Sequence, residues 1–316
     1  MTAENICLEF TGSDETAYAL AASPGFAKDG LCFAATSGGV YRSTDGGDCW
    51  ESLPIVEEQS VPMAATALAV SLAFAQDRTV FAAVKGGILR SSDGGDTWFA
   101  AKFPAPPPLF TTLAISPDFA QDGLMLAGTM EDGVFSSTDR GVNWQPWNFG
   151  LFDLGVLCLA ASPHLREDET IVAGTETGLY RSTNGGRAWR ESGFPSEFAP
   201  ILSLAYTAGK DGALLFAGTE DNGLFISCDE GASWDRSAPD TLPGSVNQLQ
   251  ILYKPDGGAE IYALSEDGVL RSRDAGRNWD FLVGTEVPPT AILVPDPSGE
   301  AMFLGLTGVG IAKYEF

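Results

Sequence analysis

Few residues in this chain carry reactive chemistry apart from its many carboxylates. His164 is the only histidine, and it follows Ser162 and Pro163 in a turn-like segment. The five cysteines form no Cys-x-x-Cys pair, so the sequence lacks the Cys/His cluster that a zinc site requires. We therefore predict that His164 is a solvated turn residue rather than a general base. No catalytic residue, no metal ligand and no cofactor is assigned.

Glycine and aspartate occur together in short segments that suggest two further kinds of site. Residues 45–48 read Asp-Gly-Gly-Asp, and similar segments follow along the chain. A phosphate-binding loop would end in Gly-Lys-Ser or Gly-Lys-Thr and open a helix, and these segments do neither. They also have too few acidic ligands for a calcium loop. We interpret them as tight turns.

These turns mark an internal repeat. Six segments share the pattern Ser-x-Asp/Asn-x-Gly-x-x-Trp, here called the box, and their tryptophans are 48, 46, 45, 45 and 45 residues apart. Ser and Asp side chains bond the backbone of a tight turn, Gly permits left-handed backbone, and Trp covers the returning strand. We predict a structural role for these pairs: Asp45 and Trp50, Asp93 and Trp98, Asp139 and Trp144, Asn184 and Trp189, Asp229 and Trp234, Asp274 and Trp279.

Strand-like segments surround each box. In the fourth repeat, residues 156–160 and 170–175 are apolar runs, and residues 178–181 lead into the box. Four short antiparallel strands per period describe one blade of a β-propeller. We predict an all-β, seven-bladed propeller that forms a single domain over residues 1–316. Its first strands run through Leu20, Leu68, Leu113, Leu159, Leu204, Ile251 and Ala291.

The last blade differs from the others because it has no box and no fourth strand. Residues 6–10, Ile-Cys-Leu-Glu-Phe, form a spare strand-like segment ahead of the first blade. We predict that this segment completes blade seven and closes the ring. Closure would also remove exposed strand edges, which promote aggregation.

The acidic composition limits the partners. The chain has 18 Lys and Arg against 42 Asp and Glu, a formal net charge of -24. Nucleic acids and anionic membranes both attract cationic proteins, so neither is an expected partner. A basic protein, a cation or a neutral ligand remains compatible. No signal peptide or long apolar run is visible, and Cys7, Cys32 and Cys158 lie in apolar segments, so we expect reduced, mostly buried thiols in a cytoplasmic protein.

The boxes resemble BNR repeats, also called Asp-boxes. Such repeats occur in sialidases, xyloglucan-degrading glycoside hydrolases, sortilin-type receptors and photosystem II assembly factors, where the box is regarded as structural. In repeat style the chain resembles regular, single-propeller bacterial proteins of the sialidase-like or photosystem II assembly-like kind. It rests on Ser23-Pro24, Phe26, Asp29-Gly30 and Phe33-Ala34 together with the boxes. The resemblance implies the propeller fold and leaves the function open.

A sialidase would need an arginine triad and a Tyr/Glu nucleophile pair. Most arginines precede a box, as Arg42 and Arg181 do, or lie inside one, and the others make no triad. No free Tyr/Glu pair stands out either. A glycosidase needs two carboxylates at a defined separation, and nothing among the 42 acids nominates a pair. We therefore expect a protein that is not an enzyme.

Strand connectivity separates the loops onto two faces. Naming the strands of a blade A to D, the A–B and C–D loops share one face, and the D–A and B–C loops share the other. The B–C loops are acidic in consecutive blades and would form an arc that attracts a basic partner or a cation. The alternative is that they are ordinary solvated turns. The residues are Glu131, Asp132, Glu176, Glu220, Asp221, Glu266 and Asp267.

An aromatic run on the same face is the second candidate for partner binding. Trp147, Phe149 and Phe152 precede blade four, and Trp147 is the only tryptophan outside a box. Such residues anchor proteins or stack on sugars, although Trp147 aligns with Leu53 and could pack between sheets. The leading hypothesis is a non-catalytic protein-binding or assembly scaffold. The alternative is a carbohydrate-binding or glycoside-hydrolase-like propeller.

Overall fold

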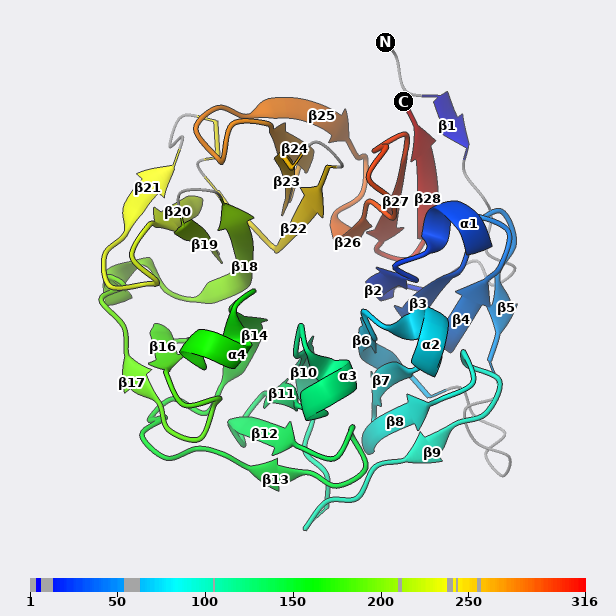
Figure 1. Ribbon diagram of the computed structural model, residues 1–316. Coiled ribbons are helices and arrows are strands. Elements are labelled where there is room, and N and C mark those ends of the chain that lie inside the picture. Colours follow the sequence, from blue (N-terminus) through cyan, green and yellow to red (C-terminus); the bar gives the residue numbers. More distant parts are fainter. Residues whose placement is uncertain are drawn as a thin grey trace.

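Seven antiparallel sheets are arranged as blades around one central axis (Figure 1). The computed structural model describes residues 4–6, 14–53, 63–104, 106–209, 212–237, 241–242, 244–254 and 257–316. Within these residues each sheet has four strands, ordered from A at the channel to D at the outside. The predicted seven-bladed all-β propeller is confirmed.

The strands follow the repeat blade by blade. Blades one to three contain β2 (Ala17–Ala22), β3 (Cys32–Thr36), β4 (Gly39–Ser43) and β5 (Glu51–Ser52); β6 (Ala65–Val70), β7 (Val80–Val84), β8 (Gly87–Ser91) and β9 (Phe99–Ala100); β10 (Phe110–Ile115), β11 (Met125–Thr129), β12 (Val134–Ser137) and β13 (Gln145–Pro146). Blades four and five contain β14 (Val156–Ala161), β15 (Ile171–Thr175), β16 (Leu179–Ser182) and β17 (Arg190–Glu191); β18 (Ile201–Gly209), β19 (Gly212–Thr219), β20 (Leu224–Ser227) and β21 (Asp235–Ser237). Blades six and seven contain β22 (Gln248–Tyr253), β23 (Ala259–Ser265), β24 (Gly268–Ser272) and β25 (Asp280–Gly284); β26 (Pro289–Leu293), β27 (Ala301–Leu306), β28 (Gly310–Glu315) and β1 (Glu4–Ile6).

An N-terminal strand closes the ring, as predicted. Strand β1 pairs antiparallel with β28, and Asn5 lies opposite Tyr314. The structure places this strand at Glu4–Ile6, whereas the sequence suggested residues 6–10. Of that segment only Ile6 lies in the described part, and residues 7–10, with Cys7, lie outside the described residues. Blade seven therefore joins the two ends of the chain (Figure 1).

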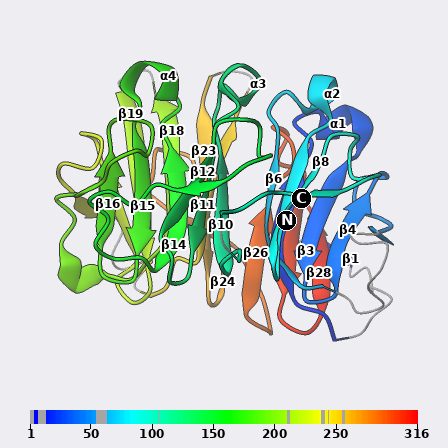
Figure 2. The ribbon, with the colours of Figure 1, turned by 90° about the horizontal axis from the view of Figure 1, so that it is seen from below.

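Short helices that the sequence reading did not foresee occupy the A–B loops of blades one to four. They lie on one side of the ring (Figure 2). A repeated Ser–Asp contact closes each of these loops, as when the Ser23 hydroxyl donates to Asp29 over 2.7 Å. His164 is the exposed N-terminal flanking residue of the last of these helices, which agrees with the predicted turn position. The helices are α1 (Phe26–Asp29), α2 (Phe74–Asp77), α3 (Phe119–Asp122) and α4 (Leu165–Asp168), and a 3-10 turn, η1 (Ser196–Phe198), lies in a D–A loop.

The hydrophobic core lies between blades. Buried side chains of blades one and two form one cluster, and those of blades seven and one form another. Phe33 on β3 meets Phe74 on α2 edge to face with 6.3 Å between ring centroids, and Phe303 meets Phe26 in the same way. Since each blade buries its faces only against its neighbours, the ring must be complete before every core is covered.

Hydrogen bonds between box residues close each box turn, and in every box but the fourth the tryptophan indole bonds within the same turn. In blade two the Ser91 hydroxyl donates to Asp93 over 2.7 Å and accepts the buried N–H of Gly95 over 2.8 Å. Asp93 accepts the N–H of Thr97, and the indole of Trp98 donates to the Gly95 carbonyl over 3.0 Å. Gly95 has φ +97°, which favours glycine. These bonds all lie within one turn, and the structural role of the box aspartate and tryptophan stays a prediction.

The fourth box shows why an asparagine replaces the aspartate there. In other boxes the second aspartate oxygen accepts a bond from the side chain four residues later, as Asp93 does from Thr97. In box four that later residue is Ala188, which offers only its backbone N–H to Asn184. A carboxylate would lack its second donor at this position, so the neutral amide is sufficient.

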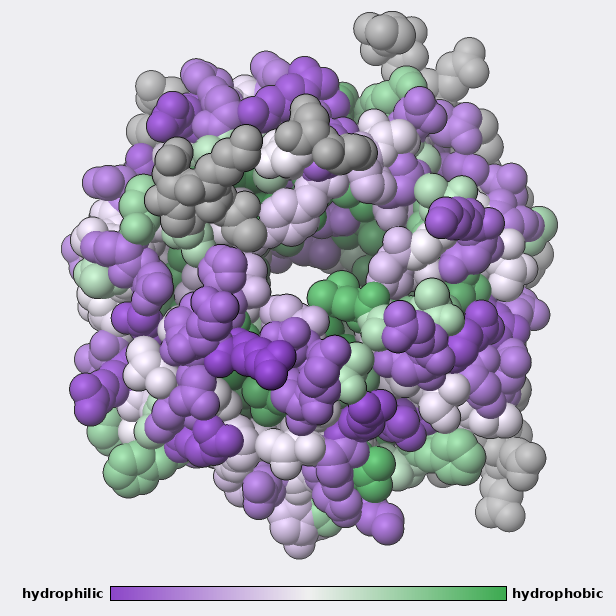
Figure 3. Space-filling view, viewed as in Figure 1, coloured by the Kyte–Doolittle hydropathy of each residue, from purple (hydrophilic) through white to green (hydrophobic). Residues whose placement is uncertain are grey.

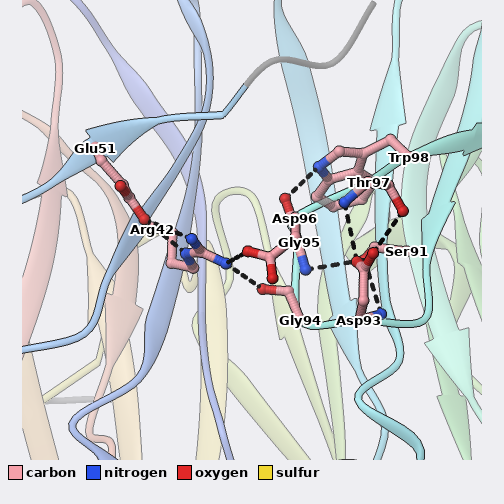
Figure 4. A network of polar contacts seen from close by, with 9 residues as sticks. All are labelled: Arg42, Glu51, Ser91, Asp93, Gly94, Gly95, Asp96, Thr97 and Trp98. Carbon is pink, nitrogen blue, oxygen red and sulfur yellow. Dashed lines mark hydrogen bonds and ion pairs between the residues drawn. The ribbon is translucent and has the colours of Figure 1, made fainter.

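Basic side chains connect neighbouring blades. Arg42 on β4 contacts Glu51 within its own blade and reaches blade two, where it donates to the Gly94 carbonyl and to Asp96 (Figure 4). Lys313, at the corresponding position of β28, forms an ion pair of 2.7 Å with Asp48 in the box of blade one. Arg42 thus links blades one and two, Arg181 links blades four and five through Glu230, and Lys313 makes the equivalent link where the ring closes.

We expect Ser91→Ala to destabilise the protein by about 1–3 kcal/mol, because it leaves the buried Gly95 N–H without a partner. Equilibrium urea unfolding measures the change. The neighbouring exposed Ser92 is the matched control, and Ser92→Ala should change stability by less than about 0.5 kcal/mol. Equal effects of the two substitutions would contradict the role given to the box serine.

The boxes also make stability dependent on acid. Burial alone would raise the pKa of Asp93, but hydrogen bonds from Thr97 and Ser91 outweigh it and lower the pKa to about 2. An unfolded aspartate has a pKa near 3.9, so the stabilisation is complete above about pH 4 and is lost as the pH falls towards about 2. Asp93→Asn should therefore be less stable than the parent protein at pH 7, with a difference that shrinks through this window. Urea titrations at several pH values test this, with exposed Asp235→Asn as the control; a difference independent of pH would contradict it.

Candidate functional site

Backbone hydrogen bonds confirm how the loops divide between the two faces. On the helix side, the C–D turn of each of the first four blades bonds to its own A–B loop, as Gly46 N–H does to Gly30. On the opposite side, B–C turns bond to D–A loops, as Met130 N–H does to Leu109. The latter face, here called the variable face, carries all the residues that the sequence proposed for partner binding.

The seven acidic residues of the B–C loops are all exposed on the variable face. They lie in consecutive blades, three to six, between strands B and C. Among the residues that the structure describes, none forms an ion pair with any of the seven. The structure therefore leaves their charges available to solvent or to a partner, and their part in binding stays a prediction.

The loop between blades three and four, residues 147–155, is firmly held. The Asn148 side chain accepts the N–H of Val134 over 2.8 Å and donates to the Asp132 carbonyl. Asp153 accepts both the backbone N–H and the hydroxyl of Thr177. These bonds join the loop to the B–C turns of both adjacent blades, so its conformation is fixed before any partner arrives.

Two phenylalanines of this loop point outward. Phe149 is 82% exposed and Phe152 is 84% exposed, whereas Leu151 between them is 5% exposed. The next D–A loop also carries two phenylalanines, Phe194 and Phe198, but both pack against Phe225 with ring centroids 5.1 and 5.0 Å apart. The described phenylalanines of these two loops thus differ in orientation, outward before blade four and inward before blade five.

Trp147 has a different environment from the two phenylalanines. Its ring is partly buried, with the Arg187 guanidinium 5.3 Å from the ring centroid. Its carbonyl accepts the indole N–H of Trp189 over 2.8 Å, which replaces the bond that Trp189 would otherwise make within its box. These contacts favour the alternative that Trp147 packs between sheets, so Phe149 and Phe152 are the aromatic residues of this loop that remain candidates for partner binding.

Three further exposed apolar residues, which the sequence did not indicate, lie in this loop, in the B–C turn of blade three or in a loop bonded to that turn. Leu109 and Met130 are joined by a backbone bond, and the Leu154 carbonyl accepts the N–H of Gly133. All three are more than a third exposed. Since isolated Leu and Met residues in loops carry no sequence signal, only the pairing of loops reveals them. We call Leu109, Met130, Phe149, Phe152 and Leu154 the apolar group.

The central channel is neutral. It encloses a cavity of about 270 Å³, and its mouth is the hollow at the centre of Figure 3. Thr66, Thr111 and Ser203, which help line it, donate their hydroxyls to backbone carbonyls of the next blade. None of the described residues that line this cavity is an aspartate or a glutamate. Its polar side chains therefore tie blades together.

Other titratable groups have structural partners. Glu260 is a largely buried acid; burial would raise its pKa, but bonds from Tyr262, Lys254 and Arg273 outweigh this and lower it. Burial raises the pKa of the Cys32 thiol to about 12, and it also raises that of Cys158. The described cysteines are all free thiols. Cys32 and Cys158 are buried as expected, whereas Cys49 and Cys228 are exposed. Within the described ranges, no three His, Cys, Asp or Glu side chains gather as a metal-binding group.

The fold and the site define the class: a seven-bladed, BNR-like β-propeller with a variable loop face. No protein-family model matches the chain, and no curated protein matches it significantly. In the part of the chain that is described, no helix is long and apolar enough to cross a membrane.

Several solved structures share the fold at low sequence identity. The extracellular domain of a one-component system from B. thetaiotaomicron aligns with 14% identity and a TM-score of 0.73; 99% of this chain is covered but only 40% of that one. A GH74 xyloglucanase from Xanthomonas campestris aligns with 20% identity and a TM-score of 0.69. The alignment covers 98% of this chain and 53% of the xyloglucanase. YCF48 bound to a D1 peptide aligns with 20% identity and a TM-score of 0.67, covering 99% and 96%. The chain thus spans about 40% of the first of these relatives.

We expect Phe149→Ser and Phe152→Ser to change the free energy of unfolding by less than about 0.5 kcal/mol each, because both side chains are already in water. Leu151→Ala, in the same loop, should cost about 2–5 kcal/mol because it leaves a cavity. Urea unfolding of the three variants measures this. Comparable losses in all three would mean that the phenylalanines are structural.

Proposed function

We propose that this propeller is a non-catalytic scaffold that binds a protein through its variable face. The observation that carries the proposal is the pair Phe149 and Phe152, which are exposed on a loop held by hydrogen bonds. Large aromatic side chains that gain burial on binding are typical anchors of protein interfaces. A loop fixed in advance loses little conformational entropy when it binds.

Two further observations support this proposal. The solved structures that share the fold include YCF48 bound to a D1 peptide, and that protein aligns over almost its whole length. None of the described residues that line the central cavity is an aspartate or a glutamate, so this cavity offers no carboxylate pair for glycoside hydrolysis. The free cysteines lead us to propose a reducing compartment, in accordance with the cytoplasmic expectation.

A glycan-binding or glycoside-hydrolase-like propeller is the second candidate. The likeness to a GH74 xyloglucanase favours it, although that enzyme is about twice as long as the aligned part. Exposed phenylalanines stack on sugar rings as well as on proteins. A glycan array and a hydrolysis assay on plant and bacterial polysaccharides address this candidate directly.

The scaffold proposal predicts a partner whose binding depends on the two phenylalanines. Tagged parent protein and the Phe149→Ser, Phe152→Ser double variant are purified from the native cells, and the bound proteins are identified by mass spectrometry. A partner retained by the parent and lost from the variant, then reconstituted from purified components, is the expected result. Phe99→Ser, an exposed phenylalanine on the outer strand of blade two, is the matched control.

Two results would contradict the proposed binding through the variable face. If no protein is retained at low or high salt by the folded parent, the scaffold proposal fails and the glycan experiments take precedence. If a partner is retained but Phe99→Ser releases it as readily as the double variant does, the variable face is the wrong surface.

A further inference from the structure

We propose that the loops of blades three and four form a docking site for a polypeptide segment that combines apolar side chains with lysine or arginine. This rests on the proposed scaffold function and narrows it to one place and one ligand chemistry. The site is the apolar group together with the four acids of the same loops, Glu131, Asp132, Asp153 and Glu176.

Exposed apolar surface is concentrated at this place. Thirteen large apolar side chains are exposed in the described part of the chain, and five of them lie on loops of these two blades on the variable face. Backbone bonds link these loops, since Met130 pairs with Leu109 and Gly133 pairs with Leu154. Single exposed apolar residues are ordinary on protein surfaces, but such a concentration on one face marks an interaction site.

The loops that carry the apolar group have an excess of negative charge, and one cation from outside them, Arg187 of the box of blade four, lies over Trp147. The described residues of the four contributing loops, 106–109, 130–133, 147–155 and 176–178, contain four acids and no lysine or arginine. Burial of Asp153 would raise its pKa, but bonds from Thr177 and Gly155 outweigh this and lower it, so its charge persists near neutral pH. A cationic segment is attracted to this surface and an anionic one is repelled.

A polypeptide fits these loops better than a sugar does. Sugar hydroxyls are recognised by free amide and hydroxyl groups placed beside an aromatic ring. Here both ends of the Asn148 amide are bonded within the protein, and the Thr177 hydroxyl donates to Asp153. Apolar side chains and carboxylates remain available on these loops. The apolar side chains match aliphatic or aromatic side chains of a ligand, and the carboxylates match its basic groups.

The site also explains why the loop is so firmly held. Leu151 anchors it in the core of blades three and four, while Phe149 and Phe152 on either side stay in water. The same loop one blade later folds both of its phenylalanines inward against Phe225. A loop that is held by hydrogen bonds and a buried leucine while two aromatic residues stay exposed is prepared for binding without rearrangement.

The test selects short random peptides displayed on phage against the intact parent protein, with counter-selection against the folded Phe149→Ser, Phe152→Ser variant. Enrichment of sequences that combine apolar residues with Lys or Arg is expected. The proposal is overturned if the selected sequences are acidic or purely polar. It is also overturned if no selected sequence binds the parent better than the double variant.

The affinity of one selected peptide for several variants then shows whether the acids of this site or the acidic surface as a whole attract the peptide. Fluorescence anisotropy should show at least about tenfold weaker binding to the double variant. A triple variant, Glu131→Gln with Asp132→Asn and Glu176→Gln, should bind the peptide several-fold more weakly than the parent. When salt is raised from about 0.05 M to about 0.5 M, the variant should lose less affinity than the parent does, because it has fewer charges to screen. The matched control removes three acids of other blades on the same face, by Glu220→Gln, Asp221→Asn and Glu266→Gln, and should bind like the parent. Equal weakening by the control set would show attraction to the whole acidic surface and overturn the local site.

These outcomes are distinguishable from those of the scaffold test. A cellular partner lost from the double variant, combined with selected peptides that lack basic residues, would retain the scaffold and overturn the ligand chemistry. Retention of no cellular protein would overturn the scaffold function itself, whatever the peptides show.

Discussion

The structure depends on the packing of each blade against its two neighbours. The buried clusters combine side chains from adjacent sheets, so one four-stranded blade cannot cover its own apolar faces. Closure is therefore a condition of stability. Strand β1 adds the N-terminal segment to the outer edge of blade seven, and two contacts join blades seven and one: the edge-to-face contact of Phe303 with Phe26 and the ion pair of Lys313 with Asp48.

A rigid ring of this kind separates structural from recognition surfaces. The helix face consists of Ser–Asp turns and boxes that repeat from blade to blade and satisfy their own polar groups. The channel hydroxyls are likewise bonded to the next blade. What varies is the opposite face, where loops of different length cross between blades, and there the scaffold can carry a site without disturbing the repeat.

The comparison of two equivalent loops shows how a site arises on such a scaffold. The D–A loops before blades four and five both contain two phenylalanines. One pair lies in solvent, while the other fills space beside Phe225 and Trp234. The change needs no new element, only a different partner for the aromatic residues, and it converts a packing loop into an exposed apolar surface.

The sequence by itself determined the fold, because its determinants are local and repeated. Ser91, Asp93 and Gly95 act within one turn, so their spacing reveals the turn, and the 45-residue period reveals the number of blades. The closing strand was also predictable, although its position at residues 4–6 was not, because several neighbouring residues share the strand-like character. Only the tertiary structure decided which loop residues are exposed, since Phe149 and Phe194 look alike in sequence and differ only in what packs against them. For the same reason only the structure shows that the loops carrying Leu109, Met130 and Leu154 are joined by backbone hydrogen bonds.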